Sequence, residues 1–127
     1  MKRYTSFLLL IVFFGAGCDK DDPLPPAPPT ADETPPTVEI TTPMDGYSYT
    51  QGDIINIKAS ADDNVAVVRV IFYRDGIFMF SDPSEPYETE WSTNKITSTG
   101  SHIITARAYD QADNEAESAE VSINIYE

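Results

Sequence analysis

Residues 68–80 read VRVIFYRDGIFMF, and they give the strongest indication of how the chain folds. Every second residue from Val68 to Phe72 is apolar, which is the period of a β-strand with one buried face. Asp75-Gly76 follows, and this dipeptide between two apolar runs favours a two-residue hairpin turn. Ile77 to Phe80 then form the return strand. The segment therefore predicts two antiparallel strands joined by a tight turn.

The same period of two recurs on both sides of this hairpin. Phe72, Tyr87 and Trp91 are expected to dominate the core, because aromatic side chains bury the largest apolar surface. No window supports a long amphipathic helix. With the hairpin, the alternating segments make about seven strands, which predicts an antiparallel β-sandwich. These further segments are residues 38–40, 55–61, 87–91, 104–108 and 121–125.

Length and charge exclude several classes of protein. A chain of 127 residues favours a single domain. The formal net charge of -13 argues against a nucleic-acid partner, which needs a basic patch, and against electrostatic adsorption to anionic lipid. One Cys and one His exclude an internal disulfide and a zinc site built from Cys and His ligands.

The N-terminus has the layout of a secretory signal peptide. A short basic segment precedes an apolar run at residues 7–14, which is too short to span a membrane, and small residues follow at 15–17. The order of these parts, ending at Cys18, resembles a bacterial lipoprotein signal, although Gly15 stands where that signal usually has Leu. The resemblance implies cleavage of residues 1–17 and lipidation of Cys18. The alternative is an ordinary signal peptide with an incidental Cys.

Lipidation would anchor the chain to a membrane through Cys18, because a multiply acylated Cys gives stable anchoring. Asp19, Lys20, Asp21 and Asp22 follow it. A Lys with acidic neighbours at this place resembles a surface-export signal of some Gram-negative lineages, so we expect an outer-membrane lipoprotein exposed at the cell surface. The alternatives are a plain acidic spacer and the periplasmic face of the outer membrane.

A proline-rich linker separates the predicted signal peptide and acylation site from the domain. Residues 23–36 read PLPPAPPTADETPP and contain seven of the ten prolines. Such a composition favours extended polyproline II and builds no packed core. At about 3.1 Å per residue, the span from Asp19 to Pro36 is expected to act as a semi-rigid stalk that reaches on the order of 50 Å. We therefore divide the chain into a signal peptide (1–17), a lipidated Cys with its linker (18–36) and a β-sandwich domain (37–127).

Six segments of the domain together form a recognisable pattern: PPTVEITTPMDG (35–46), GDIINIKASADD (52–63), VRVIFYRDG (68–76), EPYETEW (85–91), GSHIITARAYD (100–110) and VSINI (121–125). This pattern resembles the bacterial immunoglobulin-like domains that recur in cell-surface proteins and secreted glycan-active enzymes. The resemblance covers residues 35–126 and implies an immunoglobulin-like β-sandwich. Domains of this kind usually serve in display, as spacers or in binding, and they do not catalyse reactions. A single copy without an adjoining enzyme departs from their usual multidomain setting.

An outward-facing group of aromatic residues is the first candidate site. If the apolar positions of residues 68–72 and 104–108 face inward, Tyr73, Arg107 and Tyr109 face outward on neighbouring strands. Tyr126 faces outward on the last strand by the same parity. These side chains could stack on a sugar ring or contact an envelope protein. The alternative is that Tyr simply suits a half-exposed strand.

Two acidic loops are the second candidate site. Asp62 and Asp63 follow one strand, and Asp110 and Asp113 follow another, and in an immunoglobulin-like topology these loops lie at the same end. Carboxylate oxygens are the ligands that Ca²⁺ prefers. The alternative, which we favour at the level of sequence, is an ordinary role for Asp in turns, so no cofactor is expected unless it is calcium.

No catalytic residues are predicted. Catalysis needs a nucleophile with a base, a metal or a pair of tuned acids. Cys18 is assigned to the lipid, and we expect His102 to have a structural role at a strand corner. The sequence thus predicts a lipid-anchored envelope protein with one non-catalytic adhesion or docking module. The alternative is a structural spacer, or an accessory subunit of an envelope complex without a ligand site of its own.

Overall fold

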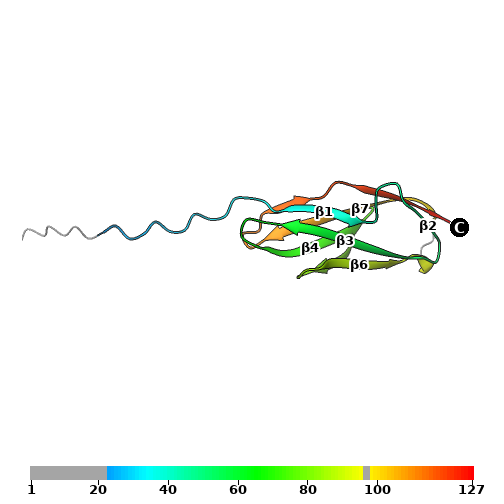
Figure 1. The fold of residues 1–127 in the computed structure, drawn as a ribbon, viewed down its shortest axis with the longest axis horizontal. Helices are drawn as coiled ribbons and strands as arrows, with labels where there is room; N and C mark the ends of the chain where they lie inside the picture. Colours follow the sequence, from blue (N-terminus) through cyan, green and yellow to red (C-terminus); the bar gives the residue numbers. More distant parts are fainter. Residues whose placement is uncertain (1–22, 96–97) are drawn as a thin grey trace, which may run out of the picture.

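The computed structural model describes residues 23–95 and 98–127. The predicted signal peptide (1–17), Cys18 and the acidic residues 19–22 therefore lie outside the described residues. None of the helices in the described part is long and apolar enough to cross a membrane. An exposed N-terminal segment leads into an all-β domain, and the C-terminus lies at the far end of that domain (Figure 1).

The described part of the domain contains nine strands and one short 3₁₀ turn, η1 (Thr93–Lys95). The seven expected strands are all present, and β2 and β8, of three residues each, are additional. In chain order the strands are β1 (Thr37–Thr42), β2 (Ser48–Thr50), β3 (Ile54–Asp62), β4 (Val67–Arg74), β5 (Ile77–Asp82), β6 (Tyr87–Ser92), β7 (Gly100–Asp110), β8 (Glu115–Glu117) and β9 (Val121–Tyr126).

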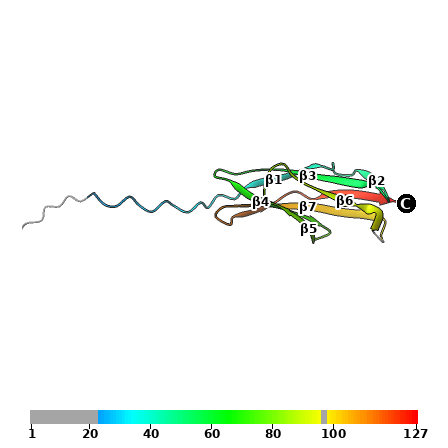
Figure 2. The same cartoon turned by 90° about the horizontal axis from the view of Figure 1, so that it is seen from below.

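The strands form two sheets that pack face to face. The smaller sheet has the order β1-β3-β6, and the larger has the order β2-β9-β7-β4-β5 with β8 paired to β7. Figure 2 shows the two layers, with β1 and β3 in one and β5 and β7 in the other. All pairings are antiparallel except that of β2 with β9. The predicted sandwich is confirmed.

The hairpin between β4 and β5 has the tight turn that its sequence predicts. Arg74 and Ile77 are cross-strand partners, so two residues make the connection. Asp75 has φ 50° and Gly76 has φ 77°. Positive φ at both central positions is the mark of a type I′ turn, whose twist matches that of the strands it joins.

The core fills the space between the sheets with side chains from alternate positions of both. Phe72, Tyr87 and Trp91 are buried as expected. Burial of apolar surface at about 25 cal/mol per Å² is the main stabilising contribution in such a layer. The other buried apolar residues are Ile55, Ile57, Ala61, Val70, Ile104, Ala106, Ala108, Val121, Ile123 and Ile125.

The proline-rich segment has no regular secondary structure from Pro23 to Pro36 and is mostly exposed. It runs away from the domain at the end where β1 begins (Figure 1). Pro36 is buried, so the chain joins the core from that residue onward.

Candidate binding surface

Three of the four predicted surface residues lie together on the outer face of the larger sheet. β4 and β7 are neighbours in register, with Tyr73 opposite Thr105 and Ile71 opposite Arg107. Because side chains alternate along a strand, Tyr73, Arg107 and Tyr109 all face away from the core. Each is partly exposed.

Arg69 belongs to the same group, and the sequence analysis did not include it. Arg69 is the cross-strand partner of Tyr109, and its guanidinium carbon lies 4.3 Å from the centroid of the Tyr109 ring. Arg107 lies over the Tyr73 ring in the same way, at 5.4 Å. Both are cation–π contacts. The alternation that places Tyr73 on the outer face of β4 also places Arg69 there, so the position of Arg69 could have been predicted from the sequence.

Phe78 extends this surface onto the edge strand β5. Its ring meets that of Tyr73 edge-on at a centroid distance of 6.4 Å, and 59% of the residue is exposed. In such a contact the edge of one ring meets the face of the other, an arrangement that aromatic pairs prefer. We call the surface formed by Arg69, Tyr73, Phe78, Arg107 and Tyr109 the arginine–tyrosine face.

Two acidic residues on β8, Glu115 and Glu117, lie next to Arg107 and Tyr109 of this face. Arg107 forms an ion pair with Glu117, and that hydrogen bond and charge raise the pKa of the guanidinium above its ordinary value. Burial, together with a hydrogen bond to Glu115 and its charge, raises the pKa of the Tyr109 phenol. Near neutral pH Arg107 is therefore charged and the phenol of Tyr109 is neutral.

Tyr126 does not join the arginine–tyrosine face. It is 60% exposed, but it lies at the end of β9, one residue beyond the pairing of Ile125 with Gly100. Tyr73 lies at the level of Thr105 on the same central strand. At about 3.3 Å per residue, the two tyrosines are separated by roughly 20 Å along the strand direction.

The predicted acidic loops do meet at one end of the sandwich. One carboxylate oxygen each from Asp32, Asp63 and Asp110 lie within 4.8 Å of one another. We call these three residues the acidic cluster. Asp62 and Asp113 are exposed and do not belong to it. Of the four acidic residues considered from the sequence, the structure brings two together.

Asp110 and Asp63 order their own loops. Asp110 is fully buried, and its Oδ1 accepts hydrogen bonds from the backbone N–H groups of Ala112 and Asn114 at 2.7 and 2.9 Å. Oδ2 of Asp63 accepts from the N–H groups of Val65 and Ala66, both at 2.9 Å. These contacts are the turn roles that Asp commonly plays.

Asp32 comes from the proline-rich segment, and the strand pattern of the domain gave no reason to expect it here. The Asn64 side-chain amide donates to its Oδ1 at 3.1 Å, and the Asn114 amide donates to its backbone carbonyl at 2.9 Å. The N–H of Thr34 donates to the same Oδ1 at 3.0 Å. The hydrogen bonds from Thr34 and Asn64 hold the pKa of Asp32 below its ordinary value.

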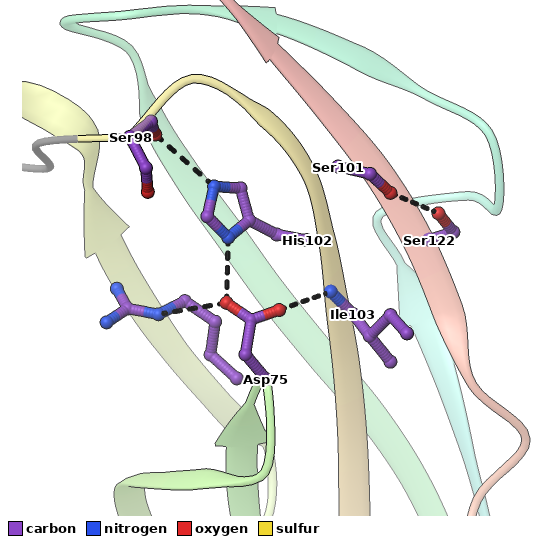
Figure 3. A network of polar contacts seen from close by, with 7 residues as sticks. Asp75, Ser98, Ser101, His102, Ile103 and Ser122 are labelled. Carbon is purple, nitrogen blue, oxygen red and sulfur yellow. Dashed lines mark hydrogen bonds and ion pairs between the residues drawn. The ribbon is translucent and has the colours of Figure 1, made fainter.

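His102 lies in a structural corner at the start of β7 (Figure 3). Its Nδ1 donates to Oδ2 of Asp75 at 2.7 Å, and its ring meets that of Trp91 edge-on at 5.2 Å. Asp75 also accepts from the N–H of Ile103 at 2.9 Å. His102 therefore connects β7 to the β4–β5 turn through Asp75. It also packs against the core, and only 8% of the residue is exposed.

Two sheets of this order, antiparallel except for β2, that pack around a core containing Trp91 are typical of an immunoglobulin-type β-sandwich. The chain belongs to the bacterial Ig domain family, whose family model matches residues 36–106. Domains of this family are typically found in cell-surface proteins, and they are typically non-catalytic.

A solved structure supports the fold independently. The chain is similar to a fibronectin(III)-like module of CbhA from Clostridium thermocellum, with a TM-score of 0.65 and 24% sequence identity. The alignment covers 71% of this chain and 96% of that module. The comparison with curated proteins finds no match.

Proposed function

We propose that this protein is a lipid-anchored envelope protein that presents one bacterial Ig domain at the cell surface for adhesion or docking. The family supports a surface module, and the sequence of residues 1–18 supports export and acylation at Cys18. The proline-rich segment serves as the stalk between the lipid and the domain. In this proposal the domain is non-catalytic.

The arginine–tyrosine face is the observation that carries the binding function. It concentrates two guanidinium groups and three aromatic rings on one side of a chain whose formal net charge is -13. Aromatic rings and arginines are the side chains most enriched where proteins bind partners. Flat tyrosine rings also suit stacking on sugar rings, and guanidinium groups suit hydrogen bonding to hydroxyl or carboxylate oxygens.

A second function, that of a spacer or an accessory subunit of an envelope complex, is favoured by one observation. Arg69 and Arg107 already lie over the rings of Tyr109 and Tyr73, so part of the face is covered within the molecule. Cross-strand contacts of this kind stabilise a sheet without any ligand.

Binding to an array of glycans and envelope proteins separates the two functions. The probe is the mature chain, without residues 1–17 and with Cys18 replaced by Ser, which retains every residue that the structure describes. Tyr73→Ala and Tyr109→Ala remove rings of the face, and Tyr126→Ala is the matched control on the same sheet. Thermal unfolding of each variant verifies that it folds.

We expect a ligand whose binding falls at least about tenfold in Tyr73→Ala and Tyr109→Ala, because aromatic anchors contribute about 2 kcal/mol or more at an interface. Tyr126→Ala is expected to bind like the unchanged chain. A ligand lost equally in all three variants places the binding site elsewhere. The absence of any ligand on the array supports the spacer instead.

A further inference from the structure

The acidic cluster joins three segments that are far apart in the sequence. Asp32 belongs to the proline-rich segment, Asp63 follows β3, and Asp110 ends β7. One oxygen of each lies within 4.8 Å of one oxygen of the others. A cation held at 2.3–2.6 Å from several oxygens, as Ca²⁺ is, requires separations of this size between them.

One carboxylate of the cluster has an oxygen that hydrogen bonding within the loops leaves without a partner. Oδ1 of Asp63 is buried and has no hydrogen-bond partner, and among the side-chain atoms that the structure describes it is the one polar atom in that condition. Leaving a buried acceptor without a hydrogen-bond partner costs about 1–3 kcal/mol. A buried carboxylate oxygen without a donor is therefore a ligand position that a cation would satisfy.

The charge of the acidic cluster also favours binding of a cation. Three carboxylates at this separation repel one another, and a cation among them is attracted to all three. The ion pairs found among the described residues join Lys58, Arg74, His102 and Arg107 to other acids. Asn64 and Asn114 place further amide groups in the cluster through their contacts with Asp32.

We propose that the acidic cluster binds a divalent cation of the calcium class, and that the cation holds the stalk against the domain. Asp63 and Asp110 are the ligands from the domain, and Asp32 is the ligand from the stalk. Amide oxygens and water complete the six to eight ligands that Ca²⁺ takes. Because Asp32 is the ligand that precedes the domain, cation binding fixes the angle at which the stalk leaves the sandwich.

Calorimetric titration of the mature Cys18→Ser chain with CaCl₂ tests the site, together with thermal unfolding in calcium and in chelator. Asp63→Asn is the principal variant, because Asn keeps an oxygen for the two N–H groups while it removes the charge. Asp62→Asn and Asp113→Asn are matched controls, since they remove neighbouring charges that lie outside the cluster. Asp113 has φ 63°, a conformation that Asn accepts readily.

We expect saturable binding with a Kd of about 0.1–1 mM, the range of extracellular calcium modules. Calcium should raise the unfolding temperature of the unchanged chain and of both controls, but not of Asp63→Asn. In chelator Asp63→Asn should be at least as stable as the unchanged chain, because it relieves the repulsion. No saturable binding below ~10 mM, or equal binding by Asp63→Asn and Asp62→Asn, would overturn the proposal.

The part played by the stalk has its own readout. Asp32→Asn should weaken calcium binding by about tenfold, because affinity follows the number of charged ligands. ¹⁵N relaxation of the Ala31 and Glu33 amides should show that calcium reduces fast motion in the unchanged chain but not in Asp32→Asn. Relaxation that is unaffected by saturating calcium would contradict the coupling of the stalk to the cation.

Discussion

Asp75 illustrates how much one side chain contributes to this fold. It occupies the first central position of the β4–β5 turn with φ 50°. Its two oxygens accept from His102 and from the N–H of Ile103. Burial raises the pKa of this carboxyl, but the hydrogen bonds from His102 and Ile103 and the charges of His102 and Arg74 outweigh it, so the pKa lies below its ordinary value.

Asp75→Asn is expected to destabilise the domain at pH 7 by about 1 kcal/mol. Charged hydrogen bonds contribute more than this when buried, but 39% of the Asp75 side chain is exposed and solvent screens it. Because the folded pKa is lowered, the stabilisation is present above about pH 4, the unfolded value, and is lost as the pH falls through the folded pKa.

Urea unfolding at pH 7 and pH 3 measures this effect. The difference between Asp75→Asn and the unchanged chain should shrink at pH 3. Asp62→Asn, an exposed acid on β3, serves as the control and should change little at either pH. An equal destabilisation by Asp75→Asn at both values would show that the charge of Asp75 contributes nothing.

At the scale of elements, the β4–β5 hairpin depends on Gly76. It has φ 77°, and a Cβ placed there would meet no atom within 4 Å. The cost of a side chain at this position is therefore backbone strain alone. Gly76→Ala should lower the free energy of unfolding by about 1–2 kcal/mol.

Gly76→Asn provides the matched comparison, because Asn adopts left-handed conformations more readily than Ala. Chemical unfolding of the two variants should place Asn between Gly and Ala. A stability of Gly76→Ala equal to that of the unchanged chain would mean that the turn relaxes to another type.

Elements with their own periodicity could be predicted from the sequence, and the others could not. β4 and β5 carry alternation and a turn signal within residues 68–80. β2 and β8 have three residues each, too few to show a pattern of their own. They are strands because β2 pairs with β9 and β8 pairs with β7. Only the folded chain reveals such pairing.

The same distinction holds for the candidate sites. Strand parity placed Tyr73, Arg107 and Tyr109 on one face, and it would also have placed Arg69 there. The place of Asp32 in the acidic cluster could not be predicted, because a proline-rich segment has no periodicity from which its contact with the domain could be inferred. Tyr126 shares the parity of the face but not its position along the strands, which depends on register.

At the scale of the whole molecule, the proline-rich segment and the C-terminus lie at opposite ends of the domain (Figure 1). An anchor at Cys18 would therefore hold the acidic cluster toward the membrane and leave the arginine–tyrosine face along the side of the domain. A binding module of this design is useful only where its partner can reach it, so exposure at the cell surface is central to the proposed function.

Antibody staining of intact cells against the Ig domain tests that claim directly. We predict that intact cells stain nearly as strongly as permeabilised ones. We also predict that Cys18→Ala abolishes the staining, because Cys18 is the only thiol in the chain and is the proposed lipid acceptor. Replacement of residues 19–22 by Ala should reduce staining of intact cells while total protein is unchanged. Staining that appears only after permeabilisation would contradict surface display.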